Sequence, residues 1–222
     1  MSNFLRTNFG PVVRSKGKEA FLKHLPPDAR VLDVGCGNNS PARSKIYAPT
    51  IHYTGLDIGD YNQSDGSIES ADRYVLTNSE DFASTIESMA DSFDAVVSAH
   101  NLEHCKDPDE TLRAMCGALT RGGQLFLAFP CEASVNFPSR ARTLNFYDDP
   151  THQKPINLSR VFEILSKSGM TVSYSVRRYR PPLLAAAGLL LEPVAALSRR
   201  SMPLTTTWAL YGFETVIWAD RR

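Results

Sequence analysis

The chain has 222 residues, of which 42% are hydrophobic and 22% charged, which is ordinary for a globular protein and enough for a sizeable core. Lys and Arg balance Asp and Glu at 24 each, so the composition argues against a general nucleic-acid binder. The four cysteines form no CxxC pair, the first ten residues lack an apolar run, and no apolar run is long enough to span a bilayer. These features predict a reduced, cytoplasmic protein without a signal peptide.

The overall charge balance conceals an asymmetry between the two parts of the chain. Residues 1–139 carry 12 Lys and Arg against 18 Asp and Glu, whereas residues 140–222 carry 12 against 6. The basic part is suited to steering an anionic substrate or to contact with an anionic membrane surface. Scattered, solvated arginines are the alternative interpretation.

Strands and helices alternate along the sequence, which predicts a parallel sheet covered on both faces. The expected strands are 31–34, 51–57, 73–76, 94–98, 124–129 after a Gly122-Gly123 turn, 171–176 and 212–219. The expected helices are 16–25, 79–89 with Ser79 as its cap, 108–119 and 158–168. Two stretches, 131–158 and 181–207, interrupt this alternation.

Residues 31–39, VLDVGCGNN, are the most informative stretch. A buried strand leads into a glycine turn, and Ser40-Pro41 is expected to be an N-cap followed by proline at the first helical position. Such a turn presents backbone amides to a ligand, and its glycines allow close approach. The missing third glycine fits a dinucleotide site poorly. A plain strand–helix connection is the alternative for this motif alone.

In these residues the chain resembles the class I S-adenosylmethionine-dependent methyltransferases. Four further features follow in the family's order: Asp57, Asn78-Ser79, residues 93–104 (FDAVVSAHNLEH) and Gly122-Gly123. The resemblance covers residues 25–180 and 210–220. It implies a doubly wound, Rossmann-like α/β fold, with a seven-stranded, mostly parallel sheet, helices on both faces and an antiparallel last strand. We expect a single methyltransferase domain over residues 1–222, with a helical insertion at about 181–207.

The resemblance also implies how the cofactor, S-adenosylmethionine, is held. Asp57 would accept both ribose hydroxyls, Ile58 would pack on the adenine, and the backbone at 98–100 would hold the methionyl part. A surface aspartate before a turn is the alternative for Asp57. The predicted cofactor-binding residues are Asp33, Gly35, Cys36, Gly37, Asp57, Ile58, Asn78, Ser79, Ser98 and His100.

Two histidines are the predicted catalytic residues. His152 lies in the connection after the fifth strand and could take the acceptor's proton, with Asp148 or Asp149 orienting its ring. The alternative is that His152 only fixes the loop. His104 is the second candidate, and its alternative is to cap the following helix together with Glu103.

Metal chemistry is not expected. Residues 100–104, HNLEH, match a zinc-protease signature, but the motif follows a strand instead of lying in a helix, so we reject that interpretation. A divalent site formed by His100, Glu103 and His152 stays open as an alternative, because the segment is similar to one in quinone-type methyltransferases.

The predicted activity is methyl transfer to an oxygen, or less favourably a nitrogen, of a small-molecule acceptor. The loop DPTHQKP at 149–155 is similar to loops in methyltransferases of surface-polysaccharide and sugar biosynthesis, which suggests a saccharide or anionic acceptor. A cofactor-binding pseudoenzyme is the alternative. The apolar run 183–191 is expected to be a buried or partner-facing helix, with peripheral membrane contact as its alternative. The sequence does not predict the oligomeric state.

Overall fold

The computed structural model describes residues 12–203 and 205–222. Its seven strands are β1 (Arg30–Val34), β2 (His52–Asp57), β3 (Arg73–Leu76), β4 (Phe93–Ala99), β5 (Leu119–Pro130), β6 (Met170–Val176) and β7 (Glu214–Arg221). They form one sheet in the order β3-β2-β1-β4-β5-β7-β6. Strands β1 to β5 pair in parallel, and β7 inserts antiparallel between β5 and β6. The predicted Rossmann-like fold is therefore confirmed.

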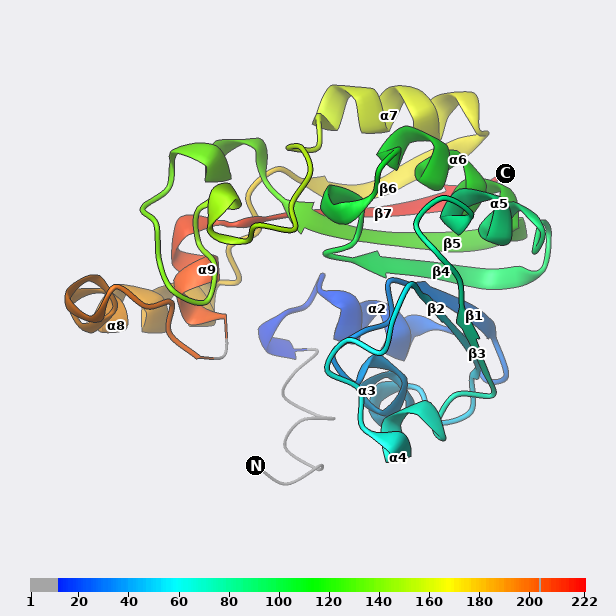
Figure 1. Cartoon of the computed structure of the whole chain (residues 1–222), viewed down its shortest axis with the longest axis horizontal. Coiled ribbons are helices and arrows are strands. Elements are labelled where there is room, and N and C mark those ends of the chain that lie inside the picture. The colour runs from blue at the N-terminus through cyan, green and yellow to red at the C-terminus, as the bar shows by residue number, and fades with distance from the viewer. Residues whose placement is uncertain (1–11, 204) are drawn as a thin grey trace.

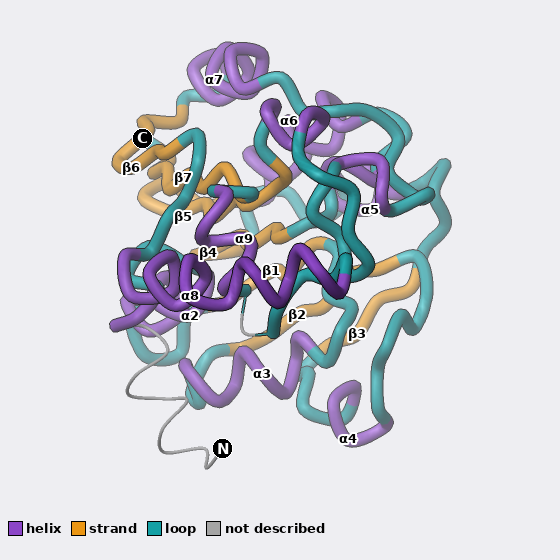
Figure 2. The backbone as a smooth tube through the Cα atoms, turned by 90° about the vertical axis from the view of Figure 1, so that its left-hand side faces the viewer, coloured by secondary structure: helices purple, strands orange, loops and turns teal. Residues whose placement is uncertain are grey.

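Helices cover both faces of this sheet (Figures 1 and 2). The helices are α2 (Lys18–His24), α3 (Ser40–Tyr47), α4 (Asp65–Ile68), α5 (Phe82–Glu87), α6 (Pro108–Ala118), α7 (Leu158–Lys167), α8 (Pro182–Ser198) and α9 (Thr206–Tyr211). Three short 3₁₀ helices are η1 (Leu102–His104), η2 (Glu132–Asn136) and η3 (Phe146–Asp148).

Strand β1 shows why the sheet is buried on both faces. Leu32 and Val34 belong to the core cluster that includes residues of α5, α6 and α7. Val31 points the other way, into the cluster that includes residues of α2. Successive side chains of a strand alternate between faces, so a strand with two covered faces must be apolar throughout. Asp33 is the exception in β1, and its partners are described below.

Two helix starts differ from the sequence prediction. Asn39, with φ of 56°, is the N-cap residue of α3, so Ser40 is its first helical residue and not its cap. The Ser40 hydroxyl instead donates to the buried Asp33 carboxylate, at 2.6 Å, which explains why it does not cap the helix. Helix α5 begins at Phe82 after Asp81, so Ser79 lies outside it and is not its cap.

Other elements also differ from expectation. Strand β5 begins at Leu119, so Gly122-Gly123 lies inside it, near an irregularity in its register with β4. Helix α6 is capped by Asp107, whose side chain accepts from the Glu110 amide. Glu103 and His104 therefore do not cap that helix. Helices α4 and α9 were not predicted.

Helix α8, which contains the apolar run 183–191, is not buried. The expectation of a buried helix is therefore wrong, and the expectation of a partner-facing helix stays a prediction. Leu190 is 81% exposed and Leu197 is 88% exposed. Figure 1 shows α8 at the edge of the molecule, beside α9. In the described residues, no helix has the length and apolar character that crossing a membrane requires.

The carboxyl ends of the central strands define where a ligand can lie. Strands β4 and β5 both point toward the connection 131–157 and α9 (Figure 1). In sheets of this type, ligands bind outside these strand ends. Asp57 ends β2, and His100 directly follows β4.

Candidate functional site

Asp33 lies beneath the glycine turn and organises it. Its Oδ2 accepts hydrogen bonds from the Lys18 ammonium at 2.7 Å, the Ser40 hydroxyl at 2.6 Å and the Tyr53 hydroxyl at 2.5 Å. The residue is 1% exposed. A buried carboxylate requires such donors, so Asp33 joins β1, β2, α2 and α3 below the turn. It lines neither of the two cavities described next.

The glycine turn leaves no room for side chains. Gly35 has φ of +77°, and a Cβ there would lie 2.5 Å from the Asn101 side-chain oxygen. A Cβ on Gly37 would lie 3.2 Å from the Tyr61 carbonyl and 3.6 Å from Asp57 Oδ2. The Cys36 side chain is buried in the core below, and burial raises the pKa of its thiol. Only the backbone of Cys36 is therefore available to a ligand.

The first cavity, which we call the Asp57 cavity, has a volume of about 440 Å³. Asp57, Ile58 and Ser79 line it on one side, and Asn101 and His104 line it on another. The Asp57 Oδ1 accepts from the Ile58 amide at 2.8 Å. Burial raises the pKa of Asp57, while hydrogen bonds from the Ile58 and Gly37 amides act in the opposite direction.

The second cavity, the Gly35 cavity, has a volume of about 420 Å³. Gly35, Gly37, His100 and Trp208 are among its lining residues, together with Lys18 from α2. Ser98 is buried behind this lining and does not reach the cavity. The two cavities flank the contact between Gly35 and the Asn101 side chain.

His100 belongs to a buried network of alternating charges. Its Nδ1 lies 3.2 Å from Glu103 Oε1, and its Nε2 lies 3.0 Å from Glu214 Oε1. Glu214 Oε2 in turn accepts from Arg14 at 2.5 Å. Carboxylates only accept, so both ring nitrogens must donate and His100 is an imidazolium.

The pKa values agree with this assignment. Burial alone would lower the pKa of His100, but its hydrogen bonds to Glu103 and Glu214 and their charges raise it to about 9. Burial alone would raise the pKa of Glu214, but the charges of Arg14 and His100 lower it to about 2. With both nitrogens bonded to carboxylates, His100 is not placed to ligate a metal, which corrects the alternative His100, Glu103 and His152 site.

His152 has different partners. Its Nδ1 lies 2.6 Å from the Phe146 carbonyl oxygen, which can only accept, so the proton must be on Nδ1. Nε2 is then the ring nitrogen that is left to accept a proton. The predicted orienting role of Asp148 is wrong, because its Oδ2 accepts from the amides of Arg140, Leu144 and Asn145. Asp149 Oδ2 lies 4.0 Å from His152 Nε2.

His104 is oriented through Thr151. The Thr151 hydroxyl donates to Asp149 Oδ1 at 2.6 Å, and the same oxygen lies 2.9 Å from His104 Nδ1. Since the hydroxyl proton is used toward Asp149, His104 Nδ1 must donate to Thr151. In His104, too, Nε2 is therefore the ring nitrogen that is left to accept a proton. Burial opposes ionisation of Asp149, but the hydrogen bonds from Thr151 lower its pKa.

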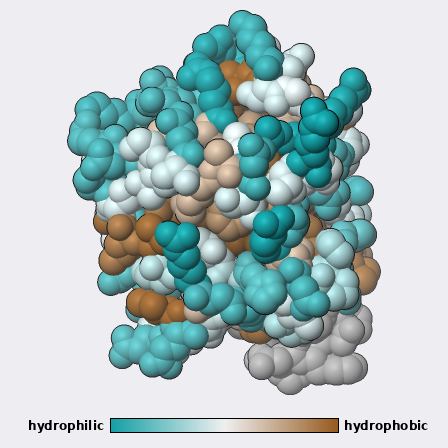
Figure 3. Space-filling model, turned by 90° about the vertical axis from the view of Figure 1, so that its right-hand side faces the viewer, coloured by the Kyte–Doolittle hydropathy of each residue, from teal (hydrophilic) through white to brown (hydrophobic). Residues whose placement is uncertain are grey.

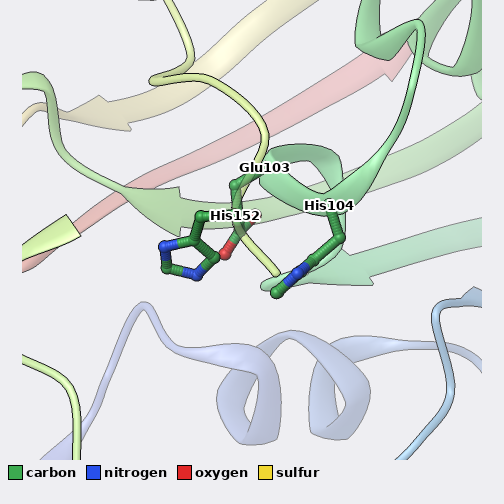
Figure 4. A group of neighbouring side chains, drawn as sticks. All are labelled: Glu103, His104 and His152. Atoms are coloured by element: carbon green, nitrogen blue, oxygen red, sulfur yellow. The ribbon is translucent and has the colours of Figure 1, made fainter. Parts of the chain in front are cut away.

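Glu103, His104 and His152 form one group at this edge of the sheet (Figure 4). The two histidine rings have centroids 4.8 Å apart. Glu103 is fully buried, and its Oε2 has no hydrogen-bond partner among the residues that the structure describes. One ligand atom from each residue lies within 4.8 Å of the others. Two ligands of one ion at bonds of about 2.1 Å are at most roughly 4.2 Å apart, so an ion would require these side chains to lie closer than that.

The structure thus brings together most of the predicted site residues. Gly35, Gly37, Asp57, Ile58, Ser79, His100 and His104 line one cavity or the other. Asn78 does not, because its side chain is engaged with Asp81 and the Glu80 amide. Sequence reasoning missed Asn101, Trp208 and Glu214. Glu214 carried a signal, since it is the one acid among apolar neighbours at the start of the last strand.

Comparison with known proteins identifies the family. A family model described as a methyltransferase domain matches residues 8–174, more than half of the chain. A ubiquinone biosynthesis O-methyltransferase of Xanthomonas axonopodis pv. citri is 34% identical over 110 residues, which is 46% of this chain and 44% of the relative. The corresponding protein of Saccharophagus degradans is 29% identical over 106 residues, 46% of this chain and 43% of the relative. The matched region spans less than half the length of these curated relatives.

Solved structures share the fold. An S-adenosylmethionine-dependent methyltransferase from Mesorhizobium loti has a TM-score of 0.59 at 16% identity, covering 95% of this chain and 96% of its own. One from Archaeoglobus fulgidus has a TM-score of 0.55 at 19% identity, covering 96% and 98%. The fold, the glycine turn with its two cavities and the matching family model agree with the predicted resemblance. The chain belongs to the methyltransferase-domain family and is a class I enzyme with S-adenosylmethionine as its cofactor.

Proposed function

We propose that the chain transfers a methyl group from S-adenosylmethionine to an oxygen atom of a small acceptor, with His152 as the general base. The observation that carries this proposal is the pair of histidines, His104 and His152, whose Nδ1 atoms are engaged by Thr151 and Phe146 and whose rings lie 4.8 Å apart beside the buried Glu103. The two cavities divide the cofactor between them. The Asp57 cavity takes the adenosyl part, and the Gly35 cavity takes the methionyl part.

The residues present fit this cofactor. The Asp57 carboxylate lines its cavity, no side chain among the described residues bonds to its Oδ2, and it is placed to accept ribose hydroxyls. Exposed Ile58 offers an apolar surface beside it for the adenine. At Gly35 a side chain would collide with Asn101, so the position beside the cavity requires glycine. When bound, S-adenosylmethionine supplies an electrophilic methyl group on a sulfonium, which is a good leaving group.

The chain's own residues then have two tasks. The first is to hold the acceptor hydroxyl in position, which supplies most of the acceleration for a reactive methyl donor. The second is to remove its proton, which His152 does at Nε2 while Phe146 keeps the proton of Nδ1 in place. The carboxylate of Asp149 stabilises the imidazolium that results, from 4.0 Å.

Oxygen is the acceptor atom that the matched relatives favour, because those relatives are named as O-methyltransferases. A neutral histidine deprotonates a phenol more readily than an aliphatic alcohol, since the phenol pKa of about 10 is closer to its own. We therefore place a phenolic hydroxyl first. A saccharide acceptor is second, supported by the sequence of the 149–155 loop and the basic C-terminal part. Trp208 and Phe126 in the Gly35 cavity offer aromatic surface to either.

The test measures S-adenosylhomocysteine formation with matched panels of phenols, saccharides and amines. His152→Ala should lower kcat about 10²- to 10⁴-fold with unchanged cofactor affinity. The wild-type rate should rise with pH, because a general base must first lose its own proton, and His152→Ala should remove this inflection. His52→Ala is the matched control, because His52 is exposed at the start of β2.

Three outcomes would count against the proposal. A raised KM without the pH inflection would make His152 a positioning residue only. An equal loss of rate and cofactor affinity would place it at the wrong end of the site. Tight cofactor binding without turnover on any acceptor class would favour the pseudoenzyme.

A further inference from the structure

Helix α8 has an unusual distribution of apolar residues. Leu183, Leu190 and Leu197 are spaced by seven residues and lie on one face, which is exposed. Gly188 and Ala195, which are buried, are also spaced by seven and are rotated by about 200° from Leu190 and Leu197. A Cβ on Gly188 would collide with the Thr206 carbonyl of α9. The helix therefore docks on α9 through small residues and turns its leucines outward.

The charged side chain of α8 is directed toward the protein instead of the solvent. Glu192 is the one charged residue of the helix, and it accepts from Arg140 at 2.6 Å and from the Tyr211 hydroxyl at 2.8 Å. It is thus tied to the protein, while the outward face is apolar. A surface helix in water normally has the opposite pattern. On the right-hand face of the molecule, hydrophilic residues predominate and hydrophobic ones appear in separate patches (Figure 3).

Exposed arginines lie just before and just after α8 in the chain. Arg178 and Arg180 precede the helix and donate to the Tyr211 carbonyl of α9, and Arg199 and Arg200 follow it. Arg142 lies beside the second pair, because the Ala141 amide donates to the Arg199 carbonyl at 2.9 Å and the Ser201 amide donates to the Ala141 carbonyl. We call this set, Leu183, Leu190 and Leu197 with the five arginines, the α8 surface.

We propose that the α8 surface binds the interface of an anionic lipid membrane. Leucines that enter the acyl boundary between clusters of arginine fit a helix lying in the membrane plane. The arginines would contact the lipid phosphates and attract the surface at a distance.

The positive charge of the α8 surface distinguishes between two partners, an anionic membrane and a second copy of the chain. In a symmetric dimer through α8, each copy would bring its own arginine clusters against those of its partner, whichever way the helices run. Such like charges oppose association. An anionic surface has the complementary sign at both ends of the helix. The proposal does not depend on the identity of the methyl acceptor.

The test is co-sedimentation of the full chain with phosphatidylcholine vesicles that contain about 30% phosphatidylglycerol. The wild type should bind, and binding should weaken at least about tenfold on pure phosphatidylcholine or in about 0.5 M NaCl. Leu190→Gln with Leu197→Gln should weaken it roughly 100-fold, because two exposed leucines no longer enter the apolar layer. Arg199→Gln with Arg200→Gln should weaken it roughly 30-fold.

Val172→Gln, an exposed apolar position on β6, is the matched control and should bind as the wild type does. Light scattering and cofactor titration accompany each variant, so misfolding is recognised separately from lost vesicle binding. Vesicle binding that is unchanged in both double variants would overturn the proposal. So would a wild-type dimer that the double leucine variant dissociates, since the helix would then be a dimer interface.

Discussion

Replacement of Asp57 by asparagine tests the cofactor site with little disturbance of the fold. The Asp57 carboxylate ends β2, and its Oδ1 accepts from the Ile58 amide at 2.8 Å. Asparagine keeps an oxygen for this bond and replaces the second carboxylate oxygen by an amide. Oδ2 lies 3.6 Å from the place where a Cβ on Gly37 would be, so it faces the glycine turn and the cavity. The substitution therefore removes the charge that we assign to the ribose.

The expected loss follows from the strength of hydrogen bonds to a charged group, about 1.5–3 kcal/mol. This corresponds to a rise in the Kd for S-adenosylhomocysteine of roughly 10- to 100-fold, measured by isothermal titration calorimetry. Asp57→Ala should bind as poorly and should also lower the Tm, by roughly 2–4 °C per kcal/mol, because it leaves the Ile58 amide without its acceptor.

Asp28→Asn is the matched control, because Asp28 is exposed in the turn before β1 and lies in neither cavity. Its Kd should equal that of the wild type. If folded Asp57→Asn kept the wild-type Kd, Asp57 would not contact the ribose. The assignment of the adenosyl part to the Asp57 cavity would then fail with it.

Three other perturbations address the rest of the site. Gly35→Ala should reduce cofactor affinity at least about tenfold, as measured by calorimetry. The new methyl group would meet Asn101 at 2.5 Å, and alanine is strained at a φ of +77°. Wild-type affinity in this variant would show that the turn is not the methionyl site. The pKa of His100 is raised from 6.5 to about 9, so its contribution to stability, at most about 3 kcal/mol, is complete below pH 6.5 and is lost as the pH rises through 9. The Tm should fall over that interval, and less so in Glu214→Gln; identical pH profiles would exclude the ion pair as the cause. EDTA should leave methyl transfer intact, whereas loss of activity restored by magnesium or zinc would assign a metal to the group around Glu103.

The parts of the fold that the sequence predicts are those governed by local periodicity. Leu32 and Val34 face one core and Val31 the other, and a run of buried apolar residues is the expected pattern for a strand covered twice. The placement of Asp57 beside Gly37 could also be predicted from the sequence, because ligands of doubly wound sheets lie at the carboxyl ends of the strands.

The failures have a common physical cause in tertiary contacts that local periodicity does not encode. Ser40 has the chemistry of a cap, but the buried carboxylate of Asp33 needs donors more than the helix start does. Helix α8 is apolar enough for a core, yet the residues that it buries are the small Gly188 and Ala195. Neither outcome follows from the spacing of apolar residues.

The three histidines near the strand ends show the same limit at the level of protonation. Two carboxylates hold His100 as an imidazolium, and one of them, Glu214, is 114 residues away in the sequence. A backbone carbonyl and a threonine hydroxyl accept from Nδ1 of His152 and His104, so Nε2 is the nitrogen that each ring has left to accept a proton. The residue type was predictable at all three positions, but these partners were not. Because both nitrogens of His100 donate to carboxylates, these contacts, and not the histidines themselves, determine which ring can act as a base.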